Sequence, residues 1–569
     1  MITETIQSGV TKALQSLGLE GDIRLEHPAD LSHGDYSTNV AFVLAKKEGE
    51  NPRALAEKIC VELNKNLPPE IEKIEIAGPG FINFYLSKIF FIERVNYITA
   101  KPDEWGTNKM LAGKKIMVEY TDPNPFKPFH IGHLMTNTIG ESIARITEAN
   151  GATVVRANYQ GDVGLHVAKA IYGMLKEGGP DGMLPASLQA EIIGTRYSWG
   201  SNEYDTNEET KKEIDAINKK IYEKSDSEIN ILYEHGRKVT LEAFEEIYKL
   251  LGTKFVHYFF ESDMAVVGAQ IVKEHTGPVF EESDGAIVFY AERYNPKLNP
   301  RVFITGAGLP TYECKELGLT KTKFEKENPD LSIVITAIEQ DNYMKVVTTA
   351  LSVIAPDWAS RMKHITHGMM RLTSGKMSSR KGNIITGESI IRDSIALVAE
   401  KVVEREMSGD DKKAIAQIVG VAALKYSILK SSIGSDIVYD PEKSISFEGD
   451  SGPYLQYTAV RAQSIIAKAG NSKIIQEVEP IEGYVITNLE KIIYGFEEVV
   501  IHAKEEFQPH HITTYLTKLA SEFNSFYANT KILVDDNPYK DYHLVLVSAF
   551  YITMRNGLYL LGIQTPEKM

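Results

Sequence analysis

The sequence predicts an α/β protein in which a doubly wound parallel sheet follows a small α+β domain and precedes an all-α helix bundle. A buried strand at residues 114–120 leads into a helix that begins near residue 130 and then into a second strand at 153–157. Apolar, strand-like runs return at 286–290, 302–305, 332–336 and 365–370. From about residue 390 onward the pattern is almost wholly helical, which indicates the bundle.

The length of the chain implies several domains, because 569 residues are too many for one hydrophobic core. We expect an N-terminal α+β domain at 1–100, a sheet domain at 110–390 and a helical domain at 391–569. In the N-terminal domain, we expect helices at 2–17 and 52–66 and strands at 71–76 and 81–86. A Gly-Pro-Gly turn joins the two strands. The polar stretch at about 177–235 is expected to be an insertion in the sheet domain.

The composition is that of an ordinary globular protein, with 43% apolar and 24% charged residues. The net charge of −15 argues only weakly against nucleic-acid binding, because phosphates respond to local basic clusters. Cys60 and Cys314 have no Cys or His partner at metal-ligand spacing, so we expect no metal and no zinc site. The start of the chain does not resemble a signal peptide, and no apolar run reaches the ~20 residues that span a bilayer. We therefore expect a cytoplasmic protein without a membrane segment.

The strand at 114–120, the helix and the strand at 153–157 form a βαβ unit, which predicts a Rossmann-like domain. Apolar side chains recur every three or four positions along the helix, at Ile131, Leu134, Met135, Ile139, Ile143 and Ile146. Asn150 and Gly151 end it. A helix that opens directly after the first parallel strand points its free N–H groups at the crevice, which makes an anion site.

Two short segments carry the strongest functional signal. One is Phe-His-Ile-Gly-His at 129–133, and the other is Lys-Met-Ser-Ser-Arg at 376–380. Taken alone, the first segment could be the start of an ordinary helix, and some simpler nucleotidyltransferases also carry it. The second, taken alone, could be a solvated basic loop. Together, in this order, they resemble the two nucleotide signatures of the class I aminoacyl-tRNA synthetases.

The surrounding residues narrow this resemblance to the arginyl-tRNA synthetases. Residues 118–133, Val-Glu-Tyr-Thr-Asp-Pro-Asn-Pro-Phe-Lys-Pro-Phe-His-Ile-Gly-His, are similar to that family's form of the first signature. Further similar segments lie at 34–39, 78–84, 158–164, 454–462 and 561–569. The likeness therefore covers essentially the whole chain, and it implies a catalytic sheet domain with an N-terminal domain and a C-terminal anticodon-binding bundle.

The resemblance implies an ATP site at the helix that begins at 130. His130 and His133, three positions apart on its first turn, would donate to phosphoryl oxygens as charge develops. Lys376, Ser378 and Arg380 would stabilise the departing pyrophosphate. The other ATP contacts that it implies are Gly132, Gly161, Asp162, Gly368, Met369 and Met377. Mg²⁺ is expected to accompany ATP, without a dedicated cage of side chains.

The resemblance also implies a pocket for arginine, whose planar and permanently charged guanidinium is best held by carboxylates and by amide or phenol oxygens. Glu119 and Asn124 would hold the amino group and backbone end of the substrate. Tyr312, Glu316 and Gln340 would line the guanidinium pocket. Without the resemblance, Tyr312 is equally well a core aromatic, and Glu119 a strand-end carboxylate that faces solvent.

The sequence departs from the family pattern in three places. Glu316 stands where the family usually has Asp, and its extra methylene shifts the pocket floor. Ser379 replaces the second lysine of the Lys-Met-Ser-Lys-Ser loop, and members of the family with that loss tend to carry a lysine at the position of Lys127. Lys127 is therefore assigned a phosphate role, against the alternative of a solvated loop lysine. Met135 and Thr136 replace the common Arg-Ser.

Contacts with tRNA are implied at both ends of the chain. Phe81 and Asn83, in the N-terminal domain, are candidates for stacking on and hydrogen bonding to an unpaired base of the tRNA elbow. A strand hydrophobe is the competing explanation for Phe81. The other candidates lie on the first helix of the C-terminal bundle: Tyr454, Gln456, Tyr457 and Arg461. Their aromatic rings and guanidinium plane would stack on bases of the anticodon loop. Their helical spacing also allows part of this set to be core.

The expected function is therefore ATP-dependent attachment of L-arginine to tRNA(Arg), by a protein that acts as a monomer. In the family, activation requires bound tRNA, and the resemblance implies the same here. Two alternatives remain. One is another class I synthetase, although the missing zinc-ligand set argues against cysteine and the acidic pocket argues against glutamate. The other is a catalytically inactive paralogue that only binds tRNA, against which the intact His130, His133 and Lys376 count.

Overall fold

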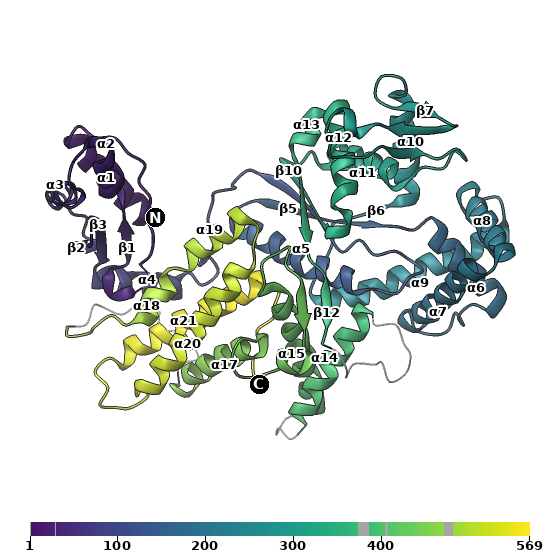
Figure 1. Ribbon diagram of the computed structural model, residues 1–569. Helices are drawn as coiled ribbons and strands as arrows, with labels where there is room; N and C mark the ends of the chain where they lie inside the picture. Colours follow the sequence, from purple (N-terminus) through teal and green to yellow (C-terminus); the bar gives the residue numbers. More distant parts are fainter. Residues whose placement is uncertain (1, 29, 374–385, 404–407, 471–481) are drawn as a thin grey trace. The chain divides into compact units, whose positions relative to one another are not determined.

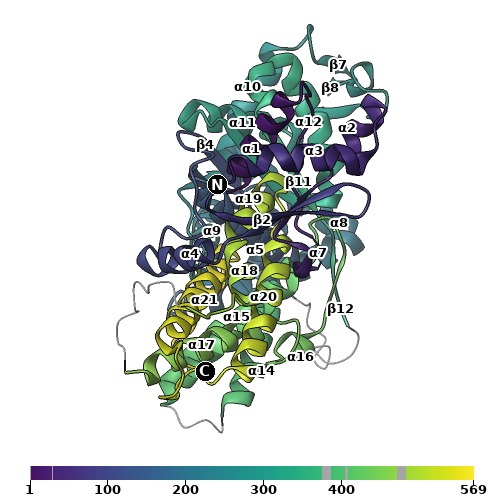
Figure 2. The same cartoon turned by 90° about the vertical axis from the view of Figure 1, so that its left-hand side faces the viewer.

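The computed structural model (Figures 1 and 2) describes residues 2–28, 30–373, 386–403, 408–470 and 482–569. The chain forms two compact units, of which the first contains residues 1–105, 461–498 and 518–556 and the second residues 106–460, 499–517 and 557–569. Four helices contribute to both: α17 (Gly452–Lys468), α19 (Phe496–Glu506), α20 (His510–Asn529) and α21 (Lys540–Leu560). The expected domain boundaries stay predictions.

The first unit contains a small antiparallel sheet in the order β1–β3–β2, built from β1 (Tyr36–Thr38), β2 (Ile71–Ala77) and β3 (Phe81–Leu86). Its early helices are α1 (Ile2–Ser16), α2 (Val40–Glu48), α3 (Pro52–Asn64) and α4 (Lys88–Ala100). The predicted helices and strands of this region are confirmed. In the turn between β2 and β3, Gly80 has φ +132° and lies so close to the Pro52 carbonyl oxygen that a Cβ there would come within 2.9 Å.

The helices of the first unit that come from the end of the chain are also well packed. α18 (Asn488–Tyr494) contacts α4, and Tyr494 joins the core of the antiparallel sheet. α20 and α21 run side by side (Figures 1 and 2), and the rings of Phe523 and Phe550 stack with centroids 3.8 Å apart. The helical pattern predicted after residue 390 therefore corresponds to real packing of helix on helix.

The second unit is organised around a five-stranded parallel sheet in the order β11–β10–β4–β5–β6. Its strands are β4 (Lys115–Glu119), β5 (Thr153–Gln160), β6 (His257–Phe260), β10 (Leu331–Ala337) and β11 (Met362–His367). The chain moves outward from β4 in one direction through β5 and β6, and in the other through β10 and β11. This doubly wound order places a switch point between β4 and β10, where open α/β sheets bind their ligands. The predicted fold class is confirmed.

Helices cover this sheet and extend beyond it (Figure 1). α5 (Ile131–Ala149) follows β4, and the later helices of the sheet domain are α10 (Glu261–Glu274), α11 (Tyr312–Glu327), α12 (Asp341–Ile354) and α13 (Pro356–Ser360). A small antiparallel sheet, β7 (Glu281–Ser283), β8 (Ala286–Phe289) and β9 (Arg301–Ile304), packs against α10 to α12 through a shared apolar core.

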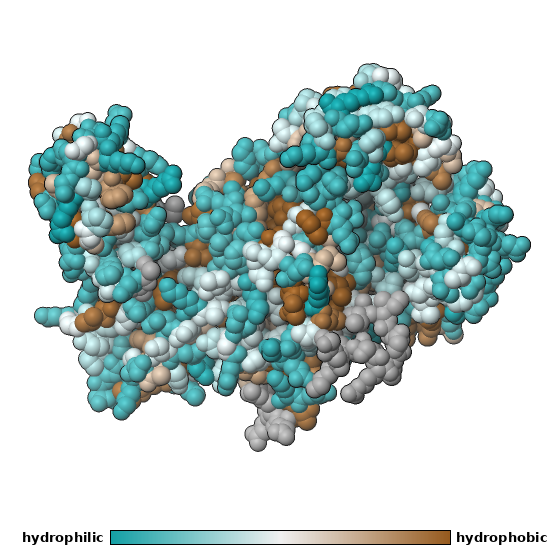
Figure 3. All heavy atoms as spheres, in the orientation of Figure 1, coloured by the Kyte–Doolittle hydropathy of each residue, from teal (hydrophilic) through white to brown (hydrophobic). Residues whose placement is uncertain are grey.

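The polar stretch at 177–235 is helical and has its own core. It contains α7 (Ala186–Thr206), α8 (Glu208–Glu223) and the first part of α9 (Ser227–Leu251), which pack with α6 (Leu165–Glu177) around Ile193, Ile214 and Ile229. The outer surface over α7 and α8 is largely hydrophilic (Figure 3), which agrees with its composition.

Two expectations about strands need correction. The run at 365–370 is not one strand, because the chain breaks at Gly368 between β11 and β12 (Met370–Leu372). Gly368 packs so tightly that a Cβ there would lie 2.4 Å from the Ser435 carbonyl oxygen. The region after 390 also contains a strand, β13 (Ile437–Tyr439), which pairs in parallel with β12. It lies among α14 (Gly387–Val402), α15 (Gly409–Leu429) and α16 (Pro441–Ser444).

One buried lysine ties three segments of the second unit together. Lys425 of α15 donates to the carbonyl oxygen of Leu251 at the end of α9 (2.6 Å) and to that of Gly562 near the end of the chain (2.7 Å). Its side chain is removed from solvent, so the two carbonyls depend on this ammonium for a partner in place of water.

We predict that Lys425→Met, which keeps the apolar stem, lowers the free energy of unfolding by about 2–4 kcal/mol, because two buried acceptors lose a charged donor. The measurement is the urea midpoint of the full chain. Lys430→Ala, at the C-cap of the same helix, is the control, since its ion pair with Asp450 is exposed and should contribute less than about 0.5 kcal/mol. Equal midpoints for the two variants would contradict the assignment.

Candidate active site

The carboxyl ends of four of the five parallel strands carry predicted site residues. Glu119 is the last residue of β4, and Gly161 follows β5 directly. Gln340 ends a short 3₁₀ turn (Ile338–Gln340) after β10, and Gly368 follows β11. Parallel strands present their carboxyl ends at one edge of the sheet, so residues far apart in the sequence meet at this edge.

The loop from β4 to α5 is held in an unusual backbone conformation. Thr121, Asp122 and Phe126 all have positive φ (82°, 46° and 68°), which costs free energy for residues with a side chain. The neighbouring elements compensate, because Asn137 donates to the Thr121 hydroxyl (3.0 Å) and the Tyr159 N–H donates to Asp122 Oδ1 (2.7 Å). The loop is thereby fixed before any ligand arrives.

His130 and His133 form a stacked pair at the start of α5. Their ring centroids lie 3.4 Å apart, and each Nδ1 accepts from the other residue's backbone N–H (3.2 and 3.4 Å). Desolvation and the charge of Lys127 lower the pKa of His130 to about 4, and burial lowers the pKa of His133 well below its usual value. Both rings are therefore neutral at pH 7. Since Nδ1 accepts, the proton of each ring resides on Nε2, which leaves two Nε2–H donors.

Lys127 precedes this pair on the same loop. It is half-buried, and its Nζ lies 5.2 Å from the centre of the Tyr197 ring. Burial and the nearby Lys169 lower its pKa, while Glu261 acts in the opposite sense. A cation at this position adds positive potential directly beside the two imidazole donors.

The second signature segment, with Lys376, Met377, Ser378 and Arg380, lies outside the described residues. The described residues on its two sides are hydrogen-bonded within the second unit. Thr373 donates its N–H to the Tyr439 carbonyl (3.1 Å), and the Gly387 N–H donates to the Phe129 carbonyl (2.8 Å). Gly387 also approaches the His130 carbonyl so closely that a Cβ would lie 2.8 Å away. Gly387 therefore lies beside the histidine pair.

A cluster of buried charge lies at the end of β4. Glu119 and Lys323 of α11 form an ion pair of 2.5 Å, and both side chains are almost fully removed from solvent. Glu316, two helical turns before Lys323, accepts a hydrogen bond from the Tyr343 hydroxyl (3.2 Å). Burial, followed by the neighbouring Glu119, raises the pKa of Glu316 to about 7 and the pKa of Asp122 well above its usual value. Three carboxyl groups thus share one lysine.

The structure brings Glu119 and Glu316 together, as expected, and adds three residues that the sequence analysis missed: Asp122, Lys323 and Tyr343. The seven-residue spacing from Glu316 to Lys323 places both on one helical face, and that signal was available in the sequence. The contact with Tyr343 was not, because it joins α11 to α12.

Asn124 and Tyr312 lie at the rim of this cluster. Asn124 packs on Gly161 so closely that a Cβ on Gly161 would lie 2.1 Å from Asn124 Oδ1 and 3.1 Å from Glu261 Oε1. Tyr312 begins α11 with 61% of its surface exposed. Beside it, Lys315 and Glu261 form a second buried ion pair at 2.6 Å. Gln340 is exposed at the end of its 3₁₀ turn.

Asp162 is already fully engaged within the protein. Its carboxylate accepts from the Ser262 N–H and hydroxyl (2.9 and 2.8 Å), from the Tyr233 hydroxyl (3.1 Å) and from Arg237 Nε (2.9 Å). This pattern makes Asp162 a tether between β5, α9 and α10. Asp162 is fully buried and its N–H donates to the Gln160 carbonyl (3.1 Å), and its contact with ATP stays a prediction. After β11, an edge strand of the same sheet, the Met369 N–H donates to Asp436 Oδ1 (2.8 Å), and Met369 is 40% exposed.

The candidate tRNA contacts differ in how accessible they are. Phe81, at the start of β3, is exposed, whereas Asn83 is buried and accepts a hydrogen bond from the Ser37 hydroxyl (2.8 Å). Gln456 is also buried, and its amide donates to the Gln564 carbonyl (2.7 Å). Both buried side chains therefore support the protein itself in this conformation.

The three remaining tRNA candidates, Tyr454, Tyr457 and Arg461, are half-buried on α17. The α17 helix lies after α14, α15 and α16, so it is not the first helix of the region that begins at 391, which corrects the expectation. Arg461 donates to Asn524 Oδ1 (2.6 Å).

Comparison with known proteins agrees with this geometry. Residues 96–440 match the model "tRNA synthetases class I (R), catalytic domain", residues 455–569 the "DALR anticodon binding domain", and residues 4–86 the "Arginyl tRNA synthetase N terminal domain". The arginine–tRNA ligase of Clostridium perfringens is 29% identical and aligns over 100% of this chain and 99% of its own. That of Clostridium botulinum is 30% identical over 96% of both chains. The structure of Thermus thermophilus arginyl-tRNA synthetase shares the fold, with a TM-score of 0.79, 24% identity and full coverage of both chains.

The doubly wound sheet, with a histidine pair at the helix after its first strand, is the catalytic domain of a class I tRNA synthetase. The matches before and after that domain make the assignment more specific. The chain belongs to the arginyl-tRNA synthetase family. Among the described residues, no helix is both long and apolar enough to cross a membrane.

We predict that Gly161→Ala raises the KM for arginine at least about tenfold with little change in thermal stability. The new methyl group would lie 2.1 Å from Asn124 Oδ1, so the Asn124 side chain has to move away from its present position. Steady-state kinetics with a melting curve provide the measurement. Gly182→Ala is the control, since nothing lies within 4 Å of a Cβ there. An unchanged KM in the first variant would show that Asn124 does not contact the substrate.

Proposed function

We propose that this protein activates L-arginine with ATP and transfers it to tRNA(Arg). The observation that carries the proposal is the buried acidic cluster at the end of β4, next to two neutral imidazole donors on the first turn of α5. The first feature suits a guanidinium or ammonium group, and the second suits a triphosphate. The arginine–tRNA ligases named above supply the reaction that joins the two.

Charge balance supports arginine as the substrate. Glu119, Asp122 and Glu316 surround a single lysine, so the pocket without substrate carries more carboxyl groups than it can ionise, and the pKa values of Asp122 and Glu316 rise. Arginine brings two cationic groups, the guanidinium and the α-ammonium. Their arrival allows the carboxyl groups to ionise and pairs each buried charge with an opposite one, which a neutral or acidic amino acid cannot do.

In the first step, a carboxylate oxygen of arginine attacks the α-phosphorus of ATP. The bond to the bridging oxygen breaks, arginyl-adenylate forms, and pyrophosphate leaves. No general base is required, because the carboxylate is already ionised at neutral pH. The Nε2–H groups of His130 and His133 and the ammonium of Lys127 would stabilise the charge on the phosphoryl oxygens. Lys376, Ser378 and Arg380 would act on the pyrophosphate, and Mg²⁺ enters with ATP as part of the substrate.

In the second step, a hydroxyl of the terminal ribose of tRNA attacks the carbonyl carbon of the adenylate. Arginyl-tRNA forms and AMP leaves, while the hydroxyl proton passes to solvent or to the AMP phosphate. Phe81 is the most accessible of the proposed tRNA contacts in the N-terminal domain, and an exposed aromatic ring suits stacking on an unpaired base. A cytoplasmic location and a monomeric state belong to the same proposal.

The test is pyrophosphate exchange with each of the twenty amino acids, with and without bulk tRNA. Exchange with arginine alone supports the proposal, and a requirement for tRNA would extend it to the behaviour expected of the family. Exchange with another amino acid would indicate a different class I specificity. The absence of exchange under all conditions would indicate a tRNA-binding paralogue without activity.

The raised pKa of Glu316 predicts that arginine binding depends on pH. In the arginine-free pocket its pKa is about 7, so at pH 6 most molecules must first release a proton before they can hold the guanidinium. The dissociation constant for arginine should therefore fall about tenfold between pH 6 and pH 8, as measured by calorimetry.

Glu316→Gln should weaken binding and remove this pH dependence. Glu325→Gln, on the exposed side of the same helix, should leave both unchanged. A flat pH profile in the unmodified protein would contradict the assignment of Glu316 to the pocket.

Lys127 is predicted to stabilise transition-state charge. Lys127→Met should lower the turnover number at least about 100-fold and change the KM for arginine little, because the ammonium acts on phosphate and not on the amino acid. Lys176→Met, at an exposed ion pair on α6, is the control. Near-normal turnover of the Lys127 variant would show that Ser379 needs no substitute cation.

A further inference from the structure

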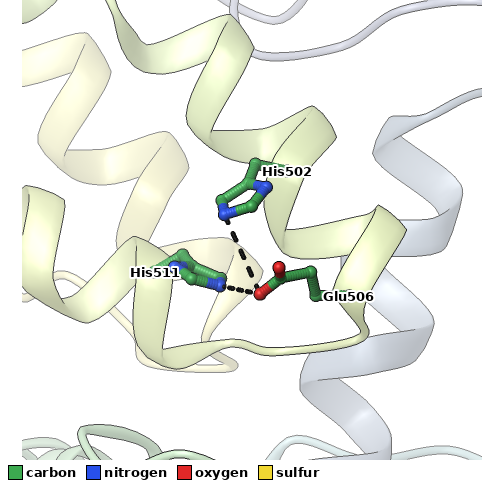
Figure 4. Close-up of side chains that lie close together, drawn as sticks. All are labelled: His502, Glu506 and His511. Carbon is green, nitrogen blue, oxygen red and sulfur yellow. Dashed lines mark hydrogen bonds and ion pairs between the residues drawn. The ribbon is translucent and has the colours of Figure 1, made fainter. Parts of the chain in front are cut away.

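Three potential metal ligands converge where α19 ends and α20 begins. His502 and Glu506 lie four residues apart on one face of α19, and His511 lies in the first turn of α20 (Figure 4). His511 Nε2 is 2.6 Å from Glu506 Oε2, and His502 Nε2 is 3.8 Å from the same oxygen. Among the residues that the structure describes, no other group of three or more His, Cys, Asp and Glu side chains is close enough to hold an ion.

The turn between the two helices fixes this arrangement. Phe507 has φ +54°, and the N–H groups of Phe507 and Gln508 donate back to the carbonyls of Lys504 and Ala503. The Gln508 side chain accepts from the Ile433 N–H (2.8 Å), and the Lys363 ammonium lies 4.8 Å from the centre of the Phe507 ring. The backbone that carries His511 toward Glu506 is therefore held by contacts that do not involve the three ligands.

The distances are compatible with one coordinated ion. The three ligand atoms lie within 4.8 Å of one another, and Zn²⁺ takes His nitrogen and carboxylate oxygen at about 2.0–2.2 Å, so two ligands on one ion are at most about 4.3 Å apart. Two of the three separations meet this limit, and the third is no more than 4.8 Å, so a small rotation of the partly exposed side chains is enough for all three to reach one ion. Because the ligands are exposed in part, solvent can fill the remaining coordination positions.

The chemistry of the ligands selects the class of metal. Two imidazole nitrogens with one carboxylate suit Zn²⁺, Co²⁺, Ni²⁺ or Cu²⁺, whereas Mg²⁺ and Ca²⁺ prefer oxygen ligands. The hydrogen bond from His511, with the charge of the other nearby imidazoles, lowers the pKa of Glu506, so the carboxylate is available as an anion at neutral pH. His510 is not part of the set, because its Nδ1 lies 3.1 Å from Gln508 Oε1.

We propose that His502, Glu506 and His511 bind one transition-metal dication, with Zn²⁺ as the reference ion, and that the ion links the end of α19 to the start of α20. None of the three residues belongs to the site at the carboxyl edge of the sheet. The proposal departs from the expectation of no zinc site, which considered only spacings around the two cysteines.

The alternative is that the three side chains form only an ion-paired cluster, in which a proton on His511 occupies the position of the metal. Both arrangements stabilise the same corner, so a change in stability upon mutation cannot distinguish them. Binding of the metal itself does, and the stacked His130 and His133 are a second place where an added metal could bind. The variants must therefore identify which site accounts for the binding.

The experiment uses the full chain, freed of metal with a chelator and titrated with Zn²⁺ against a chromophoric indicator in excess Mg²⁺. We expect one equivalent to bind with a Kd of about 10 µM or tighter, and His502→Ala and His511→Ala each to weaken it at least about tenfold. His502→Gln serves as a second variant that keeps the helix surface polar, and His33→Ala, an exposed histidine elsewhere, should bind as the unmodified chain does. In parallel, Co²⁺ should give a visible absorption band that is lost in the same variants. Equal binding in all variants, or saturation only at millimolar Zn²⁺, would overturn the proposal.

Discussion

The turn from β4 into α5 is the constraint on which the candidate active site depends. It must end a buried strand at Glu119, reverse through three residues with positive φ, and start a helix whose first turn is capped by two imidazoles. The backbone strain is offset by contacts from β5 and α5. Because the loop is held in advance, the two imidazoles and the acidic cluster keep a fixed separation, which is the condition for catalysis by positioning and charge stabilisation.

Buried charge is the second feature that organises the site. Isolated carboxylates at the end of β4 would be costly to desolvate, and Lys323 offsets only one of them. The carboxyl groups of Asp122 and Glu316 stay wholly or partly protonated, as their raised pKa values indicate. A pocket of this kind gains most from a ligand that brings positive charge, so the same desolvation that disfavours the free pocket contributes to selectivity for a cationic substrate.

Several residues at and beside the site connect the elements that carry it. Asp162 connects β5 to α9 and α10 through four hydrogen bonds, and the Glu261–Lys315 pair connects α10 to α11. Gly368 allows β11 to end against Ser435 and β12 to leave in a new direction. These contacts give Asp162 and Gly368 a role in the fold that does not depend on a bound nucleotide.

The sequence by itself determined the doubly wound sheet, the helix that begins after β4 and the two nucleotide signatures, because periodicity, strand-to-helix order and short motifs are local properties of the chain. It also identified Glu119 and Glu316 through family resemblance. It did not predict β13, the break at Gly368, the partnership of Lys323 with Glu119, or the burial of Asn83 and Gln456. These features depend on contacts between segments that are distant in the sequence, as does the meeting of His502 and Glu506 with His511 across a turn. Only the tertiary structure decided them, since the free energy of a buried charge or amide is set by the neighbours that folding brings to it.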